Sequence, residues 1–143
     1  MSEKLTEELL NELLFTSSLD SFFEKNTDLS SITLSQYLNF LLENKSFKKS
    51  EVIKKSGLNS THAYEVFSGD KGASRNKVLQ LAFAMKLNLR ETQRLLKSAR
   101  TNELYCKNKR EAIIIYCINQ NMSLESADDT LHRFSENTIC DAS

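Results

Sequence analysis

The sequence has no proline, no tryptophan and only three glycines in 143 residues. Hairpin-rich folds need glycine, proline and similar residues at their turns, and loops that cradle phosphate need closely spaced glycines. The composition therefore argues against both and predicts an all-α fold. With 40% hydrophobic and 27% charged residues, the chain can bury one ordinary core, which indicates one domain with at most a short appendage.

Long apolar runs are also missing, since none approaches the roughly 20 residues that span a bilayer. The first residues include Glu3, Glu7 and Glu8 and show neither the basic start nor the apolar stretch of a signal peptide. We therefore expect a cytoplasmic protein that makes no membrane contact.

Groups of residues able to carry out catalysis or bind metal are absent too. The cysteines Cys106, Cys117 and Cys140 match no zinc or disulfide spacing, so we expect reduced thiols, with Cys117 in the core. The histidines His62 and His132 lie far apart without neighbouring ligands, and we expect His62 at a helix surface. No nucleophile–base arrangement, paired carboxylates or glycine-rich loop is visible. We predict no enzyme activity, no metal and no cofactor.

Charge is divided unevenly along the chain, although the formal net charge is zero. Residues 1–44 hold 2 basic and 8 acidic side chains, residues 45–110 hold 16 and 5, and residues 111–143 hold 1 and 6. A basic centre of this size is typical of a protein that binds a polyanion. It is equally compatible with a solvated surface whose cations pair with the acidic flanks.

Residues 1–31 read as an acidic amphipathic arm. Its apolar positions recur at helical spacing and are Leu5, Leu9, Leu10, Leu13, Leu14, Leu19, Phe22 and Phe23. Such a stripe should not stay in water, so we expect the arm to pack on the body. The alternatives are that it holds a protein partner, or that it folds over the basic centre and competes with a polyanion.

The apolar periodicity predicts two further parts of the chain. Residues 32–100 are expected to form five helices, and residues 101–143 a helical hairpin with a tail. The five helices are expected at 34–44, 48–56, 60–67, 75–85 and 89–99. Thr33, Ser74 and Asn88 are expected N-caps, the last with Glu91 in a capping box. Gly57 is expected to end the second helix in a left-handed conformation.

A weak internal repeat relates residues 78–96 to residues 113–131 at an offset of 35. It predicts helices at 111–119 and 124–134, the same arrangement as the preceding helix pair. Chance similarity between two amphipathic hairpins is the favoured explanation, because single matches of this kind are common.

Two short helices joined by a glycine-containing turn, at 48–67, match the helix-turn-helix pattern. The second helix must present small or polar side chains outward and lock its other face into the core. Ser60, Thr61 and Tyr64 meet the first need, and Ala63, Val66 and Phe67 meet the second.

These residues resemble the phage-repressor-like (XRE-type) helix-turn-helix family over about 34–97. The closest stretches are residues 57–69, GLNSTHAYEVFSG, and residues 74–89, SRNKVLQLAFAMKLNL. The resemblance implies a five-helix DNA-binding core that regulates transcription by binding double-stranded DNA. It also implies a homodimer, with residues 112–118 forming either the dimer contact or the core of the C-terminal hairpin.

Carried over by position, the resemblance assigns base contacts to Ser60, Thr61 and Tyr64. It assigns phosphate contacts to Lys48, Lys49, Lys71, Arg75 and Lys77. Glu65 lies on the same helix, which has no Arg, Lys or Gln for bidentate base contacts. The alternative is therefore an interaction adaptor that keeps the helix-turn-helix scaffold without reading DNA and binds a protein through its N-terminal arm.

Overall fold

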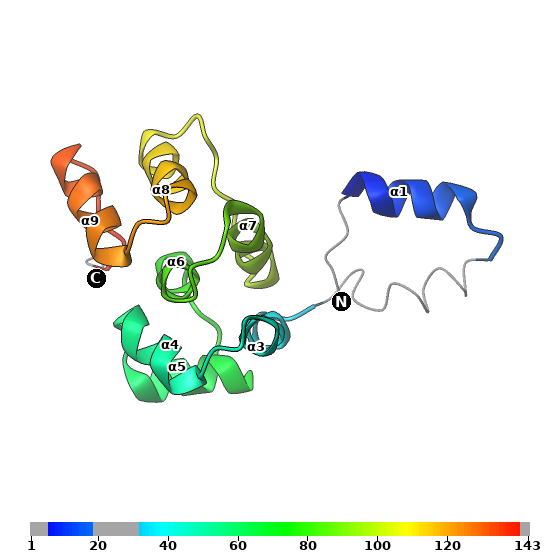
Figure 1. The fold of residues 1–143 in the computed structure, drawn as a ribbon, viewed down its shortest axis with the longest axis horizontal. Coiled ribbons are helices and arrows are strands. Elements are labelled where there is room, and N and C mark those ends of the chain that lie inside the picture. The colour runs from blue at the N-terminus through cyan, green and yellow to red at the C-terminus, as the bar shows by residue number, and fades with distance from the viewer. Residues whose placement is uncertain (1–5, 19–31, 141–143) are drawn as a thin grey trace. The chain divides into compact units, whose positions relative to one another are not determined.

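The computed structural model describes residues 6–18 and 32–140, and every regular element within these ranges is an α-helix (Figure 1). The chain divides into two units, residues 1–32 and residues 33–143, each described by itself. The all-α class is thus confirmed. Of the apolar residues expected in the N-terminal arm, Leu5, Leu19, Phe22 and Phe23 lie outside the described residues.

The N-terminal unit contains one described helix, α1 (Thr6–Phe15), with Glu7 and Glu8 in its first turn. Acidic side chains there complement the partial positive charge of a helix N-terminus. Its apolar side chains are exposed toward the C-terminal end, where Leu14 and Phe15 reach 66% and 86% exposure.

The second unit begins with five helices that match the predicted ones to within a residue or two. They are α3 (Leu34–Lys45), α4 (Lys49–Ser56), α5 (Ser60–Ser68), α6 (Arg75–Ala84) and α7 (Leu89–Ser98). Thr33 and Asn88 form capping boxes with Gln36 and Glu91. Ser74 occupies the N-cap of α6, but, contrary to expectation, its side chain makes no capping hydrogen bond.

The core of this unit lies around α6, where seven consecutive residues from Val78 to Ala84 are buried. Helix α6 packs against α4 and α7, while α3 packs against α5 and α7. Tyr37, Leu38, Phe67, Leu81 and Leu95 are each at most 1% exposed and join these helices. Burial of apolar surface between α4 and α6, and between α5 and α3, fixes the positions of α4 and α5.

The C-terminal hairpin consists of α8 (Lys109–Asn119) and α9 (Leu124–Arg133), which pack against each other. Within residues 112–118, Ile114, Cys117 and Ile118 are buried and Tyr116 is 59% exposed. Ile114, Cys117 and Ile118 therefore contribute to the core of the hairpin. Burial raises the pKa of the Cys117 thiol, which keeps it protonated and unreactive at neutral pH.

The α8–α9 hairpin repeats the backbone of the α6–α7 hairpin in detail. Left-handed residues end the corresponding helices: Lys86 and Asn121 end the first of each pair, and Arg100 and Ser135 end the second. Each left-handed residue lies 35 positions from its counterpart, and the turn hydrogen bonds correspond, as in Leu87 N to Ala82 O and Met122 N to Cys117 O. The expectation that the repeat is mere chance similarity is not supported by this agreement.

Polar side chains that hold the tail after each hairpin repeat as well. Arg75 donates to the carbonyl oxygens of Asn102 and Glu103, both at 2.9 Å. Arg110, 35 residues later, donates to those of Asn137 and Thr138 at 2.8 and 3.3 Å.

The segment after each clamp is fixed in the same way. Gln93 accepts from the backbone N–H of Leu104, and Asp128 accepts from that of Ile139, both at 2.6 Å. Leu104 and Ile139 are both buried. The chain thus contains two copies of one helix-helix-tail unit, residues 75–104 and 110–139. The first copy extends a few residues past residue 100, the predicted end of the helix-turn-helix domain.

The two copies are joined by an ion pair in which Arg75 Nη1 lies 2.8 Å from Glu111 Oε2. The hydrogen bond from Arg75 is the main cause that lowers the pKa of Glu111 from its ordinary value of 4.5. A carboxylate with a lowered folded-state pKa adds stability above its unfolded-state pKa, and this stability is lost as pH falls through the folded-state value.

We therefore expect Glu111→Gln to lower the free energy of unfolding by about 1–2 kcal/mol at neutral pH. The difference from the unmodified protein should shrink as the pH drops below 4.5, because Glu111 is then protonated in the unfolded chain and folding must release that proton to form the ion pair. Urea unfolding at about pH 7 and about pH 3 measures both differences. A difference that stays constant over this range would contradict the assignment.

Candidate nucleic-acid interface

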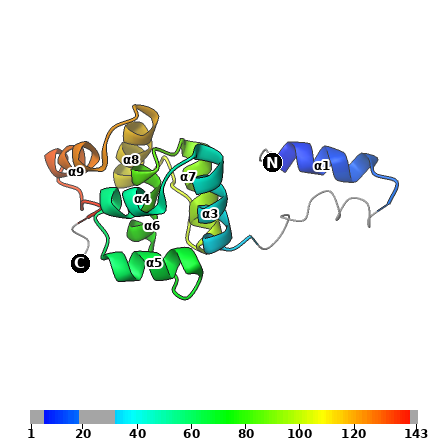
Figure 2. The same ribbon diagram turned by 60° about the horizontal axis from the view of Figure 1, so that its bottom comes forward.

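Helices α4 and α5 are joined by a three-residue turn that begins at Gly57 (Figure 2). Gly57 has φ of 75°, a left-handed conformation that ends α4 without a side-chain clash. The side chain of Asn59 caps α5 by accepting from the backbone N–H of His62 at 3.0 Å. The turn therefore ends one helix and starts the next within three residues.

A buried glutamine from α6 holds this turn in place. Gln80 Nε2 donates to the carbonyl oxygen of Ser56 at 2.9 Å. The hydroxyl of Ser56 donates to the carbonyl of Ile53 and accepts from the N–H of Leu58. Because these polar groups are shielded from water, breaking any one of the hydrogen bonds leaves a buried donor or acceptor unpaired. The turn is therefore held in one conformation. Gln80 interrupts the apolar face of α6 and was not predicted to have this role.

The other end of α5 is held by α3. Ser35 Oγ and Asn39 Nδ2 donate to the carbonyl oxygen of Phe67 at 2.6 and 2.8 Å. This carbonyl belongs to the last turn of α5, which has no intrahelical donor for it. Both ends of α5 are thus fixed to the body.

Helix α5 has a buried face and an exposed face, as its sequence predicts. Ala63, Val66 and Phe67 are at most 1% exposed. Ser60 and Thr61 are exposed at the N-terminal end, and Tyr64 is 46% exposed one turn later. Positions i, i+1 and i+4 share one side of a helix, so the three residues predicted to contact bases lie together.

Four of the predicted phosphate contacts differ in how far their side chains are exposed. Lys48 before α4 and Lys71 after α5 are exposed. Lys49 is half-buried and lies over the ring of Phe67, with Nζ 5.5 Å from the centroid. Lys77 on α6 is half-buried with Nζ 3.5 Å from His62 Nε2. Lys49 and Lys77 are therefore positioned by neighbours, and His62 is less exposed than expected.

Arg75, the fifth predicted phosphate contact, has other partners. Its guanidinium donates to two carbonyl oxygens of the tail and to the carboxylate of Glu111. Three of its N–H groups are therefore engaged within the protein and its charge is paired with Glu111, so Arg75 holds the structure together. This role was missed because its partners lie 27 to 36 residues further along the chain.

Acidic side chains lie near the same surface. Glu65 is half-buried on α5, and Asp70 is exposed in the following loop. The carboxylate of Asp70 accepts from Ser68 Oγ at 2.9 Å, which keeps it at the C-terminal end of the helix. The N-terminal end of α5, where Ser60 and Thr61 lie, carries no acidic residue.

Other kinds of site were sought in the parts of the chain that the structure describes. Residues 6–18 and 32–140 contain no group of three or more His, Cys, Asp or Glu side chains able to hold a metal ion. Over the same ranges, no helix has the length and apolar character to cross a membrane. Comparisons with family models, curated proteins and solved structures found no match for this chain.

Proposed function

We propose that α3 to α7 form a phage-repressor-like helix-turn-helix core and that the protein regulates transcription by binding double-stranded DNA. The observation that carries the proposal is the exposed polar face of α5, Ser60, Thr61 and Tyr64, together with the exposed lysines Lys48 before α4 and Lys71 after α5. In the proposed complex α5 enters the major groove by its N-terminal end while these lysines contact the backbone.

The chemistry of the α5 face determines what it can read. Serine and threonine hydroxyls donate to or accept from base edges, and the threonine methyl and tyrosine ring suit the methyl group of thymine. None of these side chains makes the bidentate contact by which arginine reads guanine. Sequence discrimination would then be modest, with phosphate contacts supplying most of the affinity.

The test is binding of the full chain to a random-sequence duplex as a function of salt, followed by fluorescence anisotropy. We expect log affinity to fall linearly with log salt concentration, with a slope of about −0.9 for each phosphate contacted. A chain that binds no duplex at low salt, or binds with no dependence on salt, refutes DNA binding.

The second candidate is an interaction adaptor that keeps the helix-turn-helix scaffold. It is favoured by α1, where Leu14 and Phe15 are largely exposed on an acidic helix. Exposed apolar clusters of this kind commonly mark protein contacts. An adaptor predicts no salt-dependent DNA binding, so the same titration separates the two functions.

A further inference from the structure

The two helix-helix-tail units face each other as an approximately two-fold pair. Helix α7 of the first unit packs on α8 of the second, and α6 of the first packs on α9 of the second. Arg75 contacts Glu111, while Arg110 contacts Asn76, the position equivalent to Glu111. Contacts that are reciprocal in this way are the mark of a two-fold relation.

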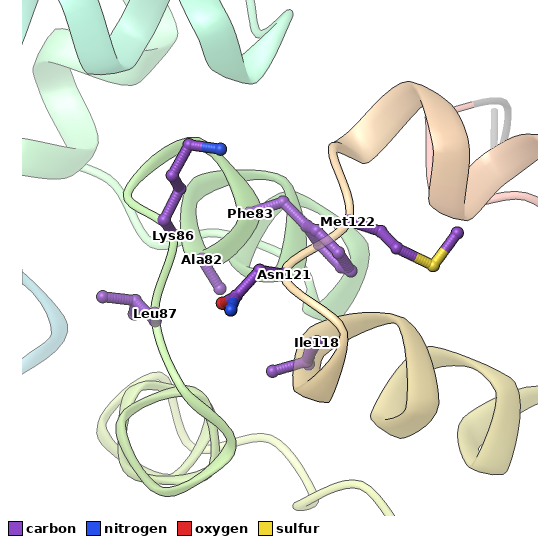
Figure 3. A pocket seen from close by; sticks show the side chains of 7 residues that line it. All are labelled: Ala82, Phe83, Lys86, Leu87, Ile118, Asn121 and Met122. Carbon is purple, nitrogen blue, oxygen red and sulfur yellow. The ribbon is translucent and has the colours of Figure 1, made fainter.

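A small pocket at the junction shows the same relation (Figure 3). Its lining pairs Phe83 with Ile118 and Leu87 with Met122, residues that are equivalent in the two units. The pair is therefore closed on itself and is not the start of an open stack. Equivalent residues that are buried in one helix-helix-tail unit and exposed in the other must then lie outside this junction.

In the first helix-helix-tail unit, residues 75–104, the outer surface is covered by the helix-turn-helix region. Helix α4 lies on α6 and α3 lies on α7. As a result Leu81 and Met85 on α6 are completely buried, and Arg94 on α7 lies over the Tyr37 ring of α3, 5.9 Å from its centroid.

In the second helix-helix-tail unit, residues 110–139, the equivalent surface is not covered by any other helix that the structure describes. Tyr116 corresponds to Leu81 and is 59% exposed, and Gln120 corresponds to Met85 and is exposed. Ala112 and Ile115 on the same side of α8 are partly exposed. Residues 112–122 carry no charge, in a chain with 27% charged residues, so α8 presents an uncharged stripe.

Acidic residues lie on α9, which packs against α8. Asp129 occupies the position equivalent to Arg94, and Glu125 the position equivalent to Arg90, so the charge of the first unit is reversed. Asp129 and Glu125 are both exposed. An occupant with an apolar face and basic flanks matches this surface, whereas an acidic helix such as α1, with Glu7 and Glu8 in its first turn, does not.

We propose that the α8/α9 face, formed by Ala112, Ile115, Tyr116, Glu125 and Asp129, is a docking site for a basic amphipathic helix of a partner protein. The helix lies across α8 and α9, on the surface that α4 and α3 cover on the equivalent helices α6 and α7. Helix α4 itself has this character, since Val52 and Ile53 are buried and Lys54 and Lys55 are exposed. The site is independent of DNA binding, which uses α5.

The experiment measures binding of a synthetic helical peptide of leucine and lysine in amphipathic order to the full chain. Its control has glutamate in place of lysine. We expect the lysine peptide to bind and the glutamate peptide to bind at least about tenfold more weakly. Tyr116→Asp and Asp129→Lys should each weaken binding of the lysine peptide about tenfold or more.

Two control variants make the same kinds of substitution outside the α8/α9 face. Tyr105→Asp alters a tyrosine that is 58% exposed outside the face, and Glu51→Lys reverses an exposed acid on α4. Both should leave peptide affinity unchanged. Equal binding of the two peptides, or equal effects of the Tyr116 and Tyr105 variants, would overturn the proposal. So would a dimer of this chain that Tyr116→Asp converts to a monomer, because a second copy would then be the occupant.

Discussion

Reversing the charge of Lys71 should weaken binding to a random DNA duplex by about tenfold or more at low salt. If the proposed interface is correct, Lys71→Glu removes one phosphate contact and places a carboxylate near the DNA backbone, so affinity falls and the salt slope becomes shallower by about one. Lys48→Glu, just before α4, should act in the same way because Lys48 is also exposed. Salt titrations of the three proteins by fluorescence anisotropy measure both quantities.

The matched control for these variants is Lys107→Glu. Lys107 is an exposed lysine just before α8, and its reversal changes the net charge by the same amount. If the effect came from net charge alone, all three variants would weaken binding equally, and the proposed interface would be wrong. A local interface predicts that Lys107→Glu keeps nearly the affinity and slope of the unmodified protein.

Local signals determine how much of the fold the sequence predicts. Helix positions follow from apolar periodicity, and helix ends follow from residues such as Thr33, Asn88 and Gly57, whose effects depend on only a few neighbours. For this reason α3 to α7 were predicted to within a residue or two. The two faces of α5 were predicted for the same reason, since a helix places its residues around the axis in a fixed order.

Long-range polar contacts explain what the sequence did not predict. Gln80 fixes the turn after α4 across 24 residues, and Arg75 reaches Glu111 across 36. Neither contact has a local pattern that distinguishes it from a surface residue. Arg75 was predicted to contact phosphate because the family resemblance was carried over to it by position.

Chance similarity was the favoured explanation of the internal repeat because single matches are common, and most of the matched positions are apolar. Amphipathic hairpins share apolar spacing whatever their origin, so such positions carry little information. The polar residues are more specific, because Arg75 and Arg110 make the same contacts to their tails, as do Gln93 and Asp128. Comparing the polar positions at the same offset would have found the clamps.

These clamps give the second large expected effect, on folding stability. Arg75→Ala should lower the free energy of unfolding by about 2 kcal/mol, because it leaves a carboxylate and two carbonyl oxygens without their donor. Arg110→Ala should cost a similar amount, since Arg110 donates to the carbonyls of Asn137 and Thr138 and to the side chain of Asn76. Urea unfolding at neutral pH measures both changes.

Lys107→Ala is the control for the loss of a long cationic side chain, and an exposed lysine of this kind should change stability by less than about 0.5 kcal/mol. DNA binding by Arg75→Ala, measured where the variant is fully folded, then separates the two roles assigned to this arginine. If its charge is used internally, the salt slope stays that of the unmodified protein, in contrast to Lys71→Glu. A slope that becomes shallower by about one with no loss of stability would restore Arg75 as a phosphate contact.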